Sequence, residues 1–417
     1  MAGRGRIHVW LRAARAGTAL CAATGVVAGA LALTGAAQAQ DKPAAREEIR
    51  IGNVNAYSGP AAVYAVLGKV PAAYFRMMND QGGVGGRQIR FITYDDAYSP
   101  PKTVEQTRKL VENDQVSVMY GSLGAPTSSA TLKYLNGHKI PHVFIASGAT
   151  KFGDQAAWPW TMGFQPSYQT EGKAFAANIL KTKPDAKIAV LYQNDDFGRD
   201  VLKGFKDGLG DKAKMIVAEA SYESTDPTID SQIVKLKASG ADVFMNMTTP
   251  KFAAQAIRKI AELGWKPTHY LGSNANSIAA VLGPAGLDNA KDIISSAYLK
   301  DANDPEWKDD PAFRKWNAFY DKYLPEADRK DALTVYAYVA AQAMEQVLRQ
   351  AGDDVTPANI MKQAANIRHF RSDLLLPGIE INTAPDDHYP IEQLQLIRFD
   401  GKQYVRFGPV IDSSKKR

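Results

Sequence analysis

The sequence predicts an α/β fold with two lobes, each built on a parallel sheet that helices cover on both faces. Apolar strand-like runs alternate with helical stretches between residues 49 and 297, an order typical of parallel sheets. This series restarts near Gln165 and Pro166. The chain has 417 residues, and cores larger than about 250–300 residues usually divide into two. We therefore expect two α/β halves.

The first strand and helix illustrate the pattern. The β-branched run IRIGNV ends at a turn that contains Ser58, Gly59 and Pro60, and an Ala/Val/Leu stretch that suits a helix follows. The predicted strands are Ile49–Val54, Gln88–Tyr94, Val116–Gly121, His142–Ala146, Ile188–Tyr192, Met215–Ala220, Val243–Met247, Tyr270–Gly272, Ile293–Ala297, Gln393–Phe399 and Gln403–Phe407. The predicted helices are Val63–Asn79, Pro101–Glu112, Ala125–Leu135, Gln169–Leu180, Arg199–Leu209, Ser231–Ser239, Lys251–Leu263, Asn276–Leu282, Pro311–Tyr323, Asp331–Ala351 and Pro357–Ala365.

The first 39 residues have the pattern of a secretory signal peptide. The basic stretch MAGRGRIHVWLRAAR is followed by an uncharged apolar run, and small residues stand at Ala37 and Ala39. We expect cleavage after Ala39 and an exported protein. The alternative is an N-terminal membrane anchor, but the Ala- and Gly-rich run is only marginally apolar enough to remain in a bilayer.

Composition narrows the possible functions. The single cysteine, Cys21, lies within the apolar run of the signal and follows Leu20, which does not fit a lipoprotein site. The mature chain then has no thiol, so disulfides, zinc thiolates and cysteine nucleophiles are excluded. The whole chain carries a formal charge of +6, but removing the four arginines of the signal leaves 46 basic and 44 acidic residues, a net charge of +2. We predict no nucleic-acid partner.

Catalytic and metal motifs are missing. The stretch Gly82–Gly86 (GGVGG) follows a helix and precedes a strand, the reverse of a dinucleotide site. His138 and His142 are separated by Pro141, which spoils a helical metal pair. The paired acids in YDDAYSPP and YQNDDFG could do acid–base chemistry, but helix capping is the interpretation we favour. We predict no catalytic residue, no metal and no cofactor.

Three loops share a pattern that indicates ligand binding. Tyr57–Pro60, Gly121–Thr127 and Ala146–Thr150 each follow a predicted strand, carry Gly, Ser or Thr, and open a helical stretch. Ligands of open α/β sheets bind at the carboxyl edge of the strands. Helix N-termini with Ser and Thr hydroxyls form anion sites there. These loops therefore predict a site for a small carboxylate between two lobes.

Taken in order, five stretches carry a resemblance to a known family. They are IRIGNVNAYSGPAA, NDQGGVGGRQIRFITYDDAYSPPKTVEQTRKLV, IASGAT, IAVLYQNDDFGRD and DSQIVKLKASGADVF. Residues 47–412 resemble the type I periplasmic solute-binding proteins of ABC importers, in the branched-chain amino acid receptor group. The resemblance implies two Rossmann-like lobes, joined by three crossovers, that close on a ligand by hinge motion. On that pattern the first lobe takes residues 47–165 and 298–372, and the second takes 166–297 and 373–412. It also implies a periplasmic location and an ABC permease as partner, and we expect a monomer.

The resemblance also suggests the ligand-binding residues. The family's amino acid receptors hold the α-carboxylate with loops that match Gly121–Thr127 and Gly148–Thr150, and hold the α-ammonium with an acid after a second-lobe strand. Here Asn274 stands at that acidic position, and an amide cannot neutralise an ammonium. Phe164, Tyr168 and Phe197 fall at cleft-facing loops, and Trp158 and Trp160 lie close by in sequence. Several aromatic residues at one cleft edge favour a flat or apolar ligand. The predicted ligand-binding residues are Tyr64, Gly124, Ala125, Thr127, Ser147, Gly148, Ala149, Thr150, Tyr168, Phe197, Thr249 and Asn274.

These observations predict an exported receptor that delivers an aromatic or other hydrophobic carboxylic acid to an ABC permease. Within the same importer family, the alternative is a receptor for branched-chain amino acids or for amides and urea. Two other classes stay open: an exported hydrolase that uses Asp95 or Asp196, and a ligand-sensing module. A nucleophile–base pair or metal cluster would favour the hydrolase, and a tethering membrane segment would favour the sensor.

Overall fold

The computed structural model describes residues 47–414. The chain divides into two units, Met1–Ala45 and Arg46–Arg417, and the description below concerns the second. The predicted signal peptide, with Cys21, lies outside the described residues. No helix among residues 47–414 combines the length and the apolar character needed to cross a membrane.

The first lobe is built on a five-stranded parallel sheet in the order β2-β1-β3-β4-β5. Its strands are β1 (Ile49–Asn55), β2 (Ile89–Asp95), β3 (Val118–Tyr120), β4 (His142–Ile145) and β5 (Thr161–Gly163). Its helices are η1 (Ala62–Ala65), α1 (Val66–Asp80), α2 (Pro100–Arg108), η2 (Lys109–Asn113), α3 (Ala125–Gly137) and η3 (Thr150–Gly153). Our sequence analysis missed β5, because three residues that follow two tryptophans give no alternating pattern.

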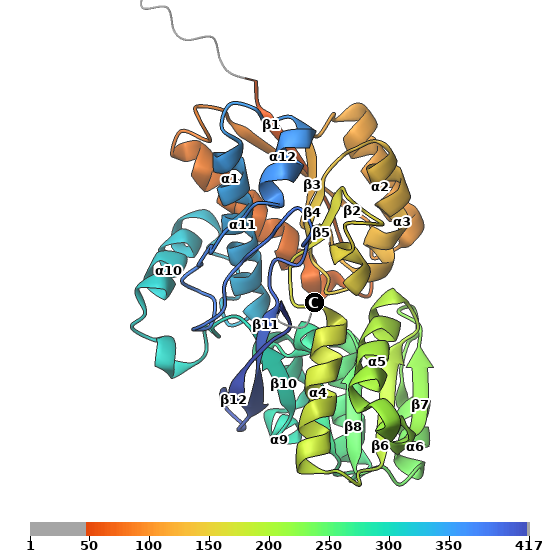
Figure 1. Ribbon diagram of the computed structural model, residues 1–417. Coiled ribbons are helices and arrows are strands. Elements are labelled where there is room, and N and C mark those ends of the chain that lie inside the picture. The colour runs from red at the N-terminus through yellow and green to blue at the C-terminus, as the bar shows by residue number, and fades with distance from the viewer. Residues whose placement is uncertain (1–46, 415–417) are drawn as a thin grey trace, which may run out of the picture. The chain divides into compact units, whose positions relative to one another are not determined.

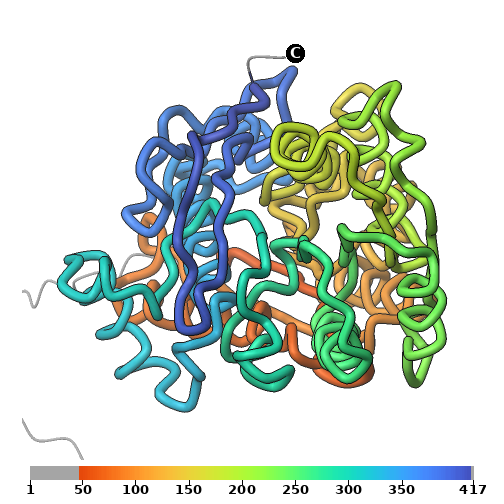
Figure 2. The backbone as a smooth tube through the Cα atoms, turned by 90° about the horizontal axis from the view of Figure 1, so that it is seen from below, coloured from red at the N-terminus to blue at the C-terminus, as the bar shows by residue number. Residues whose placement is uncertain are grey.

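The second lobe is built on a seven-stranded sheet in the order β12-β11-β10-β9-β8-β6-β7. Its strands are β6 (Ile188–Gln193), β7 (Ile216–Tyr222), β8 (Val243–Met247), β9 (Thr268–Leu271), β10 (Ile294–Ala297), β11 (Gln393–Phe399) and β12 (Tyr404–Asp412). The C-terminal hairpin is antiparallel, and β11 pairs antiparallel with β10, so this sheet is mixed. Figure 2 shows the hairpin in dark blue beside the teal segment that contains β10.

The helices of the second lobe follow its strands in turn. They are α4 (Tyr168–Thr182), α5 (Asp196–Leu209), η4 (Gly210–Met215), α6 (Asp230–Ala238), α7 (Pro250–Glu262), η5 (Ser273–Ala275), η6 (Ile278–Leu282), α8 (Gly283–Ala285) and α9 (Leu287–Ala290). The predicted helix Asn276–Leu282 is wrong in its type. The structure has a 3-10 turn before Asn276 and a π turn after it, because the Ser277 hydroxyl accepts from Ala280 N–H and caps the second turn.

The C-terminal helices pack on the first lobe. They are η7 (Pro305–Trp307), α10 (Pro311–Tyr323), α11 (Ala332–Ala351) and α12 (Pro357–Ala364). Buried residues of α10, α11 and α12 share one apolar cluster with β1, β3 and α1, and the partly buried Trp307 of η7 packs against it. In Figure 1 α10, α11 and α12 accordingly lie with α1, apart from β6–β8.

The chain passes between the two lobes three times. The crossings follow β5, follow β10 and precede β11, since residues 49–163 form the first sheet and the strands of 188–297 and 393–412 form the second. Leu374–Leu376, Ile379, Ile381 and Ile391 share the apolar cluster of the first lobe. The predicted boundary after residue 372 therefore differs from this packing, in which the last crossing follows Ile391.

The predicted α/β fold with two lobes is confirmed.

Candidate ligand-binding cleft

A cavity of about 130 Å³ lies between the two lobes. A dry cavity of about 150 Å³ accepts benzene, so this space suits a ring-sized group. Its wall comes from both sheets, from the crossings and from the C-terminal helices. The lining residues are Tyr64, Leu67, Tyr98, Leu123, Gly124, Ala125, Ala146, Gln165, Tyr168, Phe197, Thr249, Pro250, Ser273, Asn274, Asn276, Ser277, Ala280, Ser296, Ala297, Tyr298, Leu299, Lys300, Asp301, Asp304, Trp307, Ala332, Leu333, Tyr336, Leu376, Ile397, Tyr404 and Arg406.

Aromatic side chains form much of the wall where the first lobe faces α4 and α5. Tyr64, Tyr98, Tyr168 and Phe197 are all buried and line the cavity. The rings of Tyr168 and Phe197 meet edge to face, with centroids 4.9 Å apart. Such a wall favours an apolar or flat ligand, because aromatic rings bury large apolar areas and stack with other rings. Phe164, Trp158 and Trp160, which we also expected near the cleft, are not among the lining residues.

The N-terminus of α3 opens onto the cavity without a side-chain cap. Its N-cap residue is Gly124, with φ 97° and ψ 152°, a conformation that glycine adopts readily. A Cβ at this position would come within 2.6 Å of the Tyr98 ring. The N–H groups of Ala125 and Thr127 have no partner among the described residues. Unpaired N–H groups at the positive end of a helix dipole form a site for a carboxylate.

We predicted that Thr127 contacts the ligand, but its hydroxyl does not face the cavity. Its hydroxyl is fully buried and donates to the carbonyl oxygens of Leu123 and Gly124. This leaves the hydroxyl proton engaged within the first turn of α3. Thr127 is not among the lining residues of the cavity, and its hydroxyl group stabilises the loop that places Gly124.

The loop after β4 lies behind Tyr168 rather than on the wall. Tyr168 N–H donates to Gly148 O at 2.7 Å, and a Cβ on Gly148 would come within 2.9 Å of the Tyr168 ring. Ser147, Gly148, Ala149 and Thr150 are not among the lining residues, although Ala146 is. The ring of Tyr168 therefore lines the cavity at the position where we predicted this loop.

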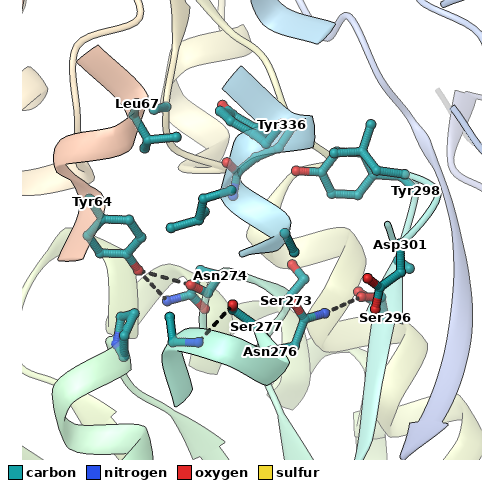
Figure 3. A pocket seen from close by; sticks show the side chains of 18 of the residues that line it. Tyr64, Leu67, Ser273, Asn274, Asn276, Ser277, Ser296, Tyr298, Asp301 and Tyr336 are labelled. Atoms are coloured by element: carbon teal, nitrogen blue, oxygen red, sulfur yellow. Dashed lines mark hydrogen bonds between the residues drawn. The ribbon is translucent and has the colours of Figure 1, made fainter. Parts of the chain in front are cut away.

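The second lobe closes the cavity with amide and hydroxyl groups. Asn274 Nδ2 donates to Thr248 O at 3.1 Å, and the Tyr64 hydroxyl donates to Asn274 O at 3.0 Å. Figure 3 shows Tyr64 of the first lobe pointing down to Asn274, with Ser273 and Ser277 beside it. Asn274 Oδ1 is buried and has no hydrogen-bond partner among the described residues. The contact therefore joins the lobes, and an acceptor stays available for a ligand.

Thr249 contributes from the start of α7. It is the N-cap residue, and it lines the cavity. Its N–H donates to the Tyr222 hydroxyl at 3.0 Å, and its own hydroxyl lies 3.3 Å from Gln193 Oε1. This network holds Thr249 in place, so that its side chain is a fixed part of the wall.

Acidic side chains near this part of the cavity are engaged elsewhere. Glu171 is buried, and its Oε1 accepts from Ser273 N–H at 2.9 Å and from the Ser296 hydroxyl at 2.6 Å. Burial raises the pKa of Glu171. Asp196 pairs with Lys151 at 2.9 Å. Neither carboxylate is among the lining residues of the cavity.

A polar groove at the rim links the two lobes. Thr150 N–H donates to Asp200 Oδ2 at 2.7 Å, and Gln169 Nε2 donates to Asp200 Oδ1 at 2.7 Å. The Tyr389 hydroxyl donates to Thr150 O at 2.8 Å. Thr150 and Ala149, both predicted to contact ligand, line this groove. The groove therefore holds contacts between α5 of the second lobe and the loop after β4 of the first.

Catalytic and metal chemistry find little support in the cleft. Among residues 47–414, no group of three or more His, Cys, Asp or Glu side chains is arranged to hold a metal ion. Asp95, a candidate for a hydrolase, accepts from Tyr57 N–H at 2.8 Å and from the Ser58 hydroxyl at 2.5 Å. It stabilises the loop after β1, and it is not a lining residue of the cavity.

Our sequence analysis missed the part of the wall that lies near the crossings. Tyr298 and Asp301 follow β10, Tyr336 lies on α11, and Tyr404 and Arg406 lie on β12. The rule that ligands bind where strands end at a sheet edge does not select these positions. Only the path of the crossings brings them to the cleft.

Two α/β lobes that enclose a ring-sized cavity define a two-lobe solute receptor. The comparisons with known proteins agree. A family model described as "Periplasmic binding protein" matches residues 48–403, and the chain belongs to this family. Members of this family are substrate-binding receptors rather than enzymes.

Known relatives and structures extend over most of the chain. The Leu/Ile/Val-binding protein homolog 1 of Brucella abortus (strain 2308) is 27% identical over 335 residues, which are 76% of this chain and 83% of that protein. A branched chain amino acid ABC transporter protein from Thermus thermophilus with bound valine has a TM-score of 0.79 at 17% identity, covering 88% of this chain and 97% of that one. A solute binding protein from R. palustris in complex with 4-hydroxybenzoate has a TM-score of 0.73 at 16% identity, with the same coverage. At these identities the structures share the fold. The comparisons thus place the chain in the Periplasmic binding protein family and show that it shares the fold of these structures.

Proposed function

We propose that this protein is the receptor of an ABC importer that captures a small aromatic or other hydrophobic carboxylic acid. One observation carries the proposal: the cavity joins an uncapped helix N-terminus at Gly124 and Ala125 to an amide, Asn274, where an α-amino acid needs an acid. The ligand carboxylate accepts from the N–H group of Ala125, at the N-terminus of α3. Its apolar body lies among the aromatic side chains of the wall.

The amide disfavours an ordinary α-amino acid. An ammonium group is strongly hydrated, and burying it without a carboxylate costs several kcal/mol. Asn274 Oδ1 is one neutral acceptor, and Glu171, whose Oε1 accepts from Ser273 and Ser296, does not line the cavity. A ligand that has a carboxylate and no ammonium avoids this cost.

The aromatic wall favours a ring. Tyr64, Tyr98, Tyr168 and Phe197 leave a space whose volume is close to that of a benzene site. Burying a ring of this size contributes about 2–3 kcal/mol from apolar area, before any gain from ring-to-ring geometry. Benzoate, phenylpropionate and phenylpropenoate are the simplest members of this class.

A competition titration tests the proposal. Calorimetry on the wild type should give tighter binding of an aryl carboxylate than of leucine. Asn274→Asp should weaken the aryl acid, because it places a second negative charge near the site, and should improve leucine. Asn317→Asp on the exposed face of α10 is the matched control, and it should change neither affinity.

The same experiments distinguish this proposal from a branched-chain amino acid receptor and from an exported hydrolase. Tight leucine binding by the wild type, with no measurable binding of an aryl acid, would restore the branched-chain amino acid receptor. Mass spectrometry of the recovered ligand should find it unchanged, whereas a converted product would favour an exported hydrolase.

A further inference from the structure

The cavity continues past Ser296 to the crossings between the lobes. The chain after β10 runs beside residues 374–376, since Lys300 N–H donates to Leu374 O at 2.9 Å and Leu376 N–H donates to Tyr298 O at 3.0 Å. Tyr298, Asp301 and Leu376 line the cavity here, together with Tyr404 and Arg406 of β12. We name this part the hinge-side end. In Figure 3 Tyr298 and Asp301 lie to one side of the pocket, across from Tyr64.

The hinge-side end contains polar groups without protein partners. Tyr404 is only 7% exposed, and its buried hydroxyl has no hydrogen-bond partner among the described residues. Asp301 is partly buried, and both hydrogen bonds to its carboxylate, from Asn303 N–H and from Asn303 Nδ2, end on Oδ1 at 2.8 Å. Oδ2 is therefore an unused acceptor.

Asp301 and Tyr404 both line this end of the cavity. Burial raises the pKa of Tyr404, and the negative charge of Asp301 raises it further. Burial also raises the pKa of Asp301. Buried polar groups normally find partners, and an unmade hydrogen bond costs about 1–3 kcal/mol. A single ligand group that both donates and accepts can satisfy the two residues together.

The cations at this end are already paired. Lys300 Nζ lies 2.7 Å from Asp310 Oδ2, and Arg406 Nη2 lies 2.5 Å from Glu306 Oε2. Both also lie over the ring of Trp307, at 4.7 and 5.1 Å from its centroid. These pairs close the hinge-side end, and they leave no free cation for a second carboxylate.

We infer that the hinge-side end is a subsite for a hydroxyl group at the far end of the ligand, which donates to Asp301 Oδ2 and accepts from the Tyr404 hydroxyl. The inference rests on the proposed function, in which the carboxylate of the same ligand lies at the N-terminus of α3. It narrows the ligand class to aryl or arylalkyl acids that carry a hydroxyl group opposite the carboxylate.

Three probes that differ only at the far end test the subsite. They are 3-(4-hydroxyphenyl)propionate, 3-phenylpropionate and 3-(4-methoxyphenyl)propionate, of which only the first has a donor. Wild-type protein should bind the hydroxyl compound at least about tenfold more tightly than the other two, because a hydrogen bond to a charged acceptor contributes about 1.5–3 kcal/mol.

Two variants separate the donor from the acceptor. Tyr404→Phe removes one hydroxyl at nearly constant size. In Asp301→Asn, the two bonds from Asn303 hold the amide oxygen at the Oδ1 position, so an NH₂ donor replaces the Oδ2 acceptor. Tyr404→Phe should reduce the preference for the hydroxyl probe over the phenyl probe, and Asp301→Asn should abolish it. The matched controls are Tyr134→Phe, at a half-buried position whose hydroxyl donates to Glu112, and Asp309→Asn, at an exposed position. Neither residue lines the cavity, so both variants should keep the wild-type ratio.

The ratio between probes, rather than one affinity, is the readout, so a variant that is merely less stable does not mimic the result. Equal wild-type affinity for all three probes would overturn the subsite and leave the proposed function standing. An unchanged ratio in both variants would also overturn the subsite. Failure of the wild type to bind any of the three acids would overturn the proposed function, and the subsite with it.

Discussion

Replacing Asp200 with alanine removes a contact that joins the two lobes at the rim of the cleft. The Asp200 carboxylate on α5 accepts from Thr150 N–H and from Gln169 Nε2, each at 2.7 Å. Thr150 follows β4 of the first lobe, so one of these bonds forms only when the lobes are together. The neighbouring pair of Lys151 and Asp196, at 2.9 Å, also crosses between the lobes.

The expected magnitude follows from this geometry. A hydrogen bond from an N–H group to a carboxylate contributes about 1.5–3 kcal/mol, and partial exposure at the rim places it at the lower limit. Losing about 1.5 kcal/mol makes the closed form roughly tenfold less populated relative to the open form. Only the closed form binds ligand tightly, so the apparent Kd should rise by the same factor by which the closed fraction falls. That factor is at most about tenfold.

Calorimetry and small-angle X-ray scattering measure the two consequences of Asp200→Ala. The Kd for an aryl carboxylate should rise, and the ligand-free radius of gyration should increase toward that of the open form. Asp207→Ala is the control, because Asp207 bonds Lys203 at 2.5 Å within the same helix. If Asp200→Ala matched the wild type in both Kd and radius, rim contacts would have no part in closure.

Other perturbations give equally specific expectations. A Cβ on Gly204 would come within 2.2 Å of Gln169 Cα, so Gly204→Ala should separate α4 from α5 and cost about 1–3 kcal/mol in urea unfolding. Gly137→Ala, with no atom within 4 Å of its Cβ, should instead be neutral or stabilising; equal effects of the two would contradict this packing argument. Burial lowers the pKa of His142 to about 3, so the folded state keeps it neutral while the unfolded chain binds a proton below about pH 6.5. Stability from this group is therefore complete above pH 6.5 and falls by about 1.4 kcal/mol per pH unit below it, and His142→Leu should remove that part of the slope; an identical slope in the variant would refute it. Sedimentation should find a monomer with and without ligand, and a stable dimer would contradict that expectation.

Local patterns were enough to predict the α/β class and most elements. Strands such as Ile49–Asn55 and Val243–Met247 are apolar runs buried by helices, and burial on both faces leaves a signal that each segment carries by itself. The loop at Gly124 was also predictable, because a strand end that leads into a helix has a defined place at the sheet edge. Asn274, which the family resemblance indicated, also lines the cavity.

Side-chain direction decided which predicted residues reach the cavity. Thr127 and Ala125 belong to the same turn, yet the Thr127 hydroxyl bonds its own backbone while Ala125 lies on the wall. Gly148 follows a strand as predicted, and the ring of Tyr168 covers it. Sequence spacing places a residue on an element, but which atoms face the ligand depends on the packing of neighbouring elements.

The hinge-side end is a product of the tertiary structure. Asp301 and Tyr404 are about a hundred residues apart in the chain, and neither belongs to a motif. The crossing after β10 and the hairpin of β11 and β12 bring them to one cavity. The Tyr404 hydroxyl is buried and unpaired only because the surrounding segments exclude water from it. This is a long-range condition that no local pattern in the sequence records.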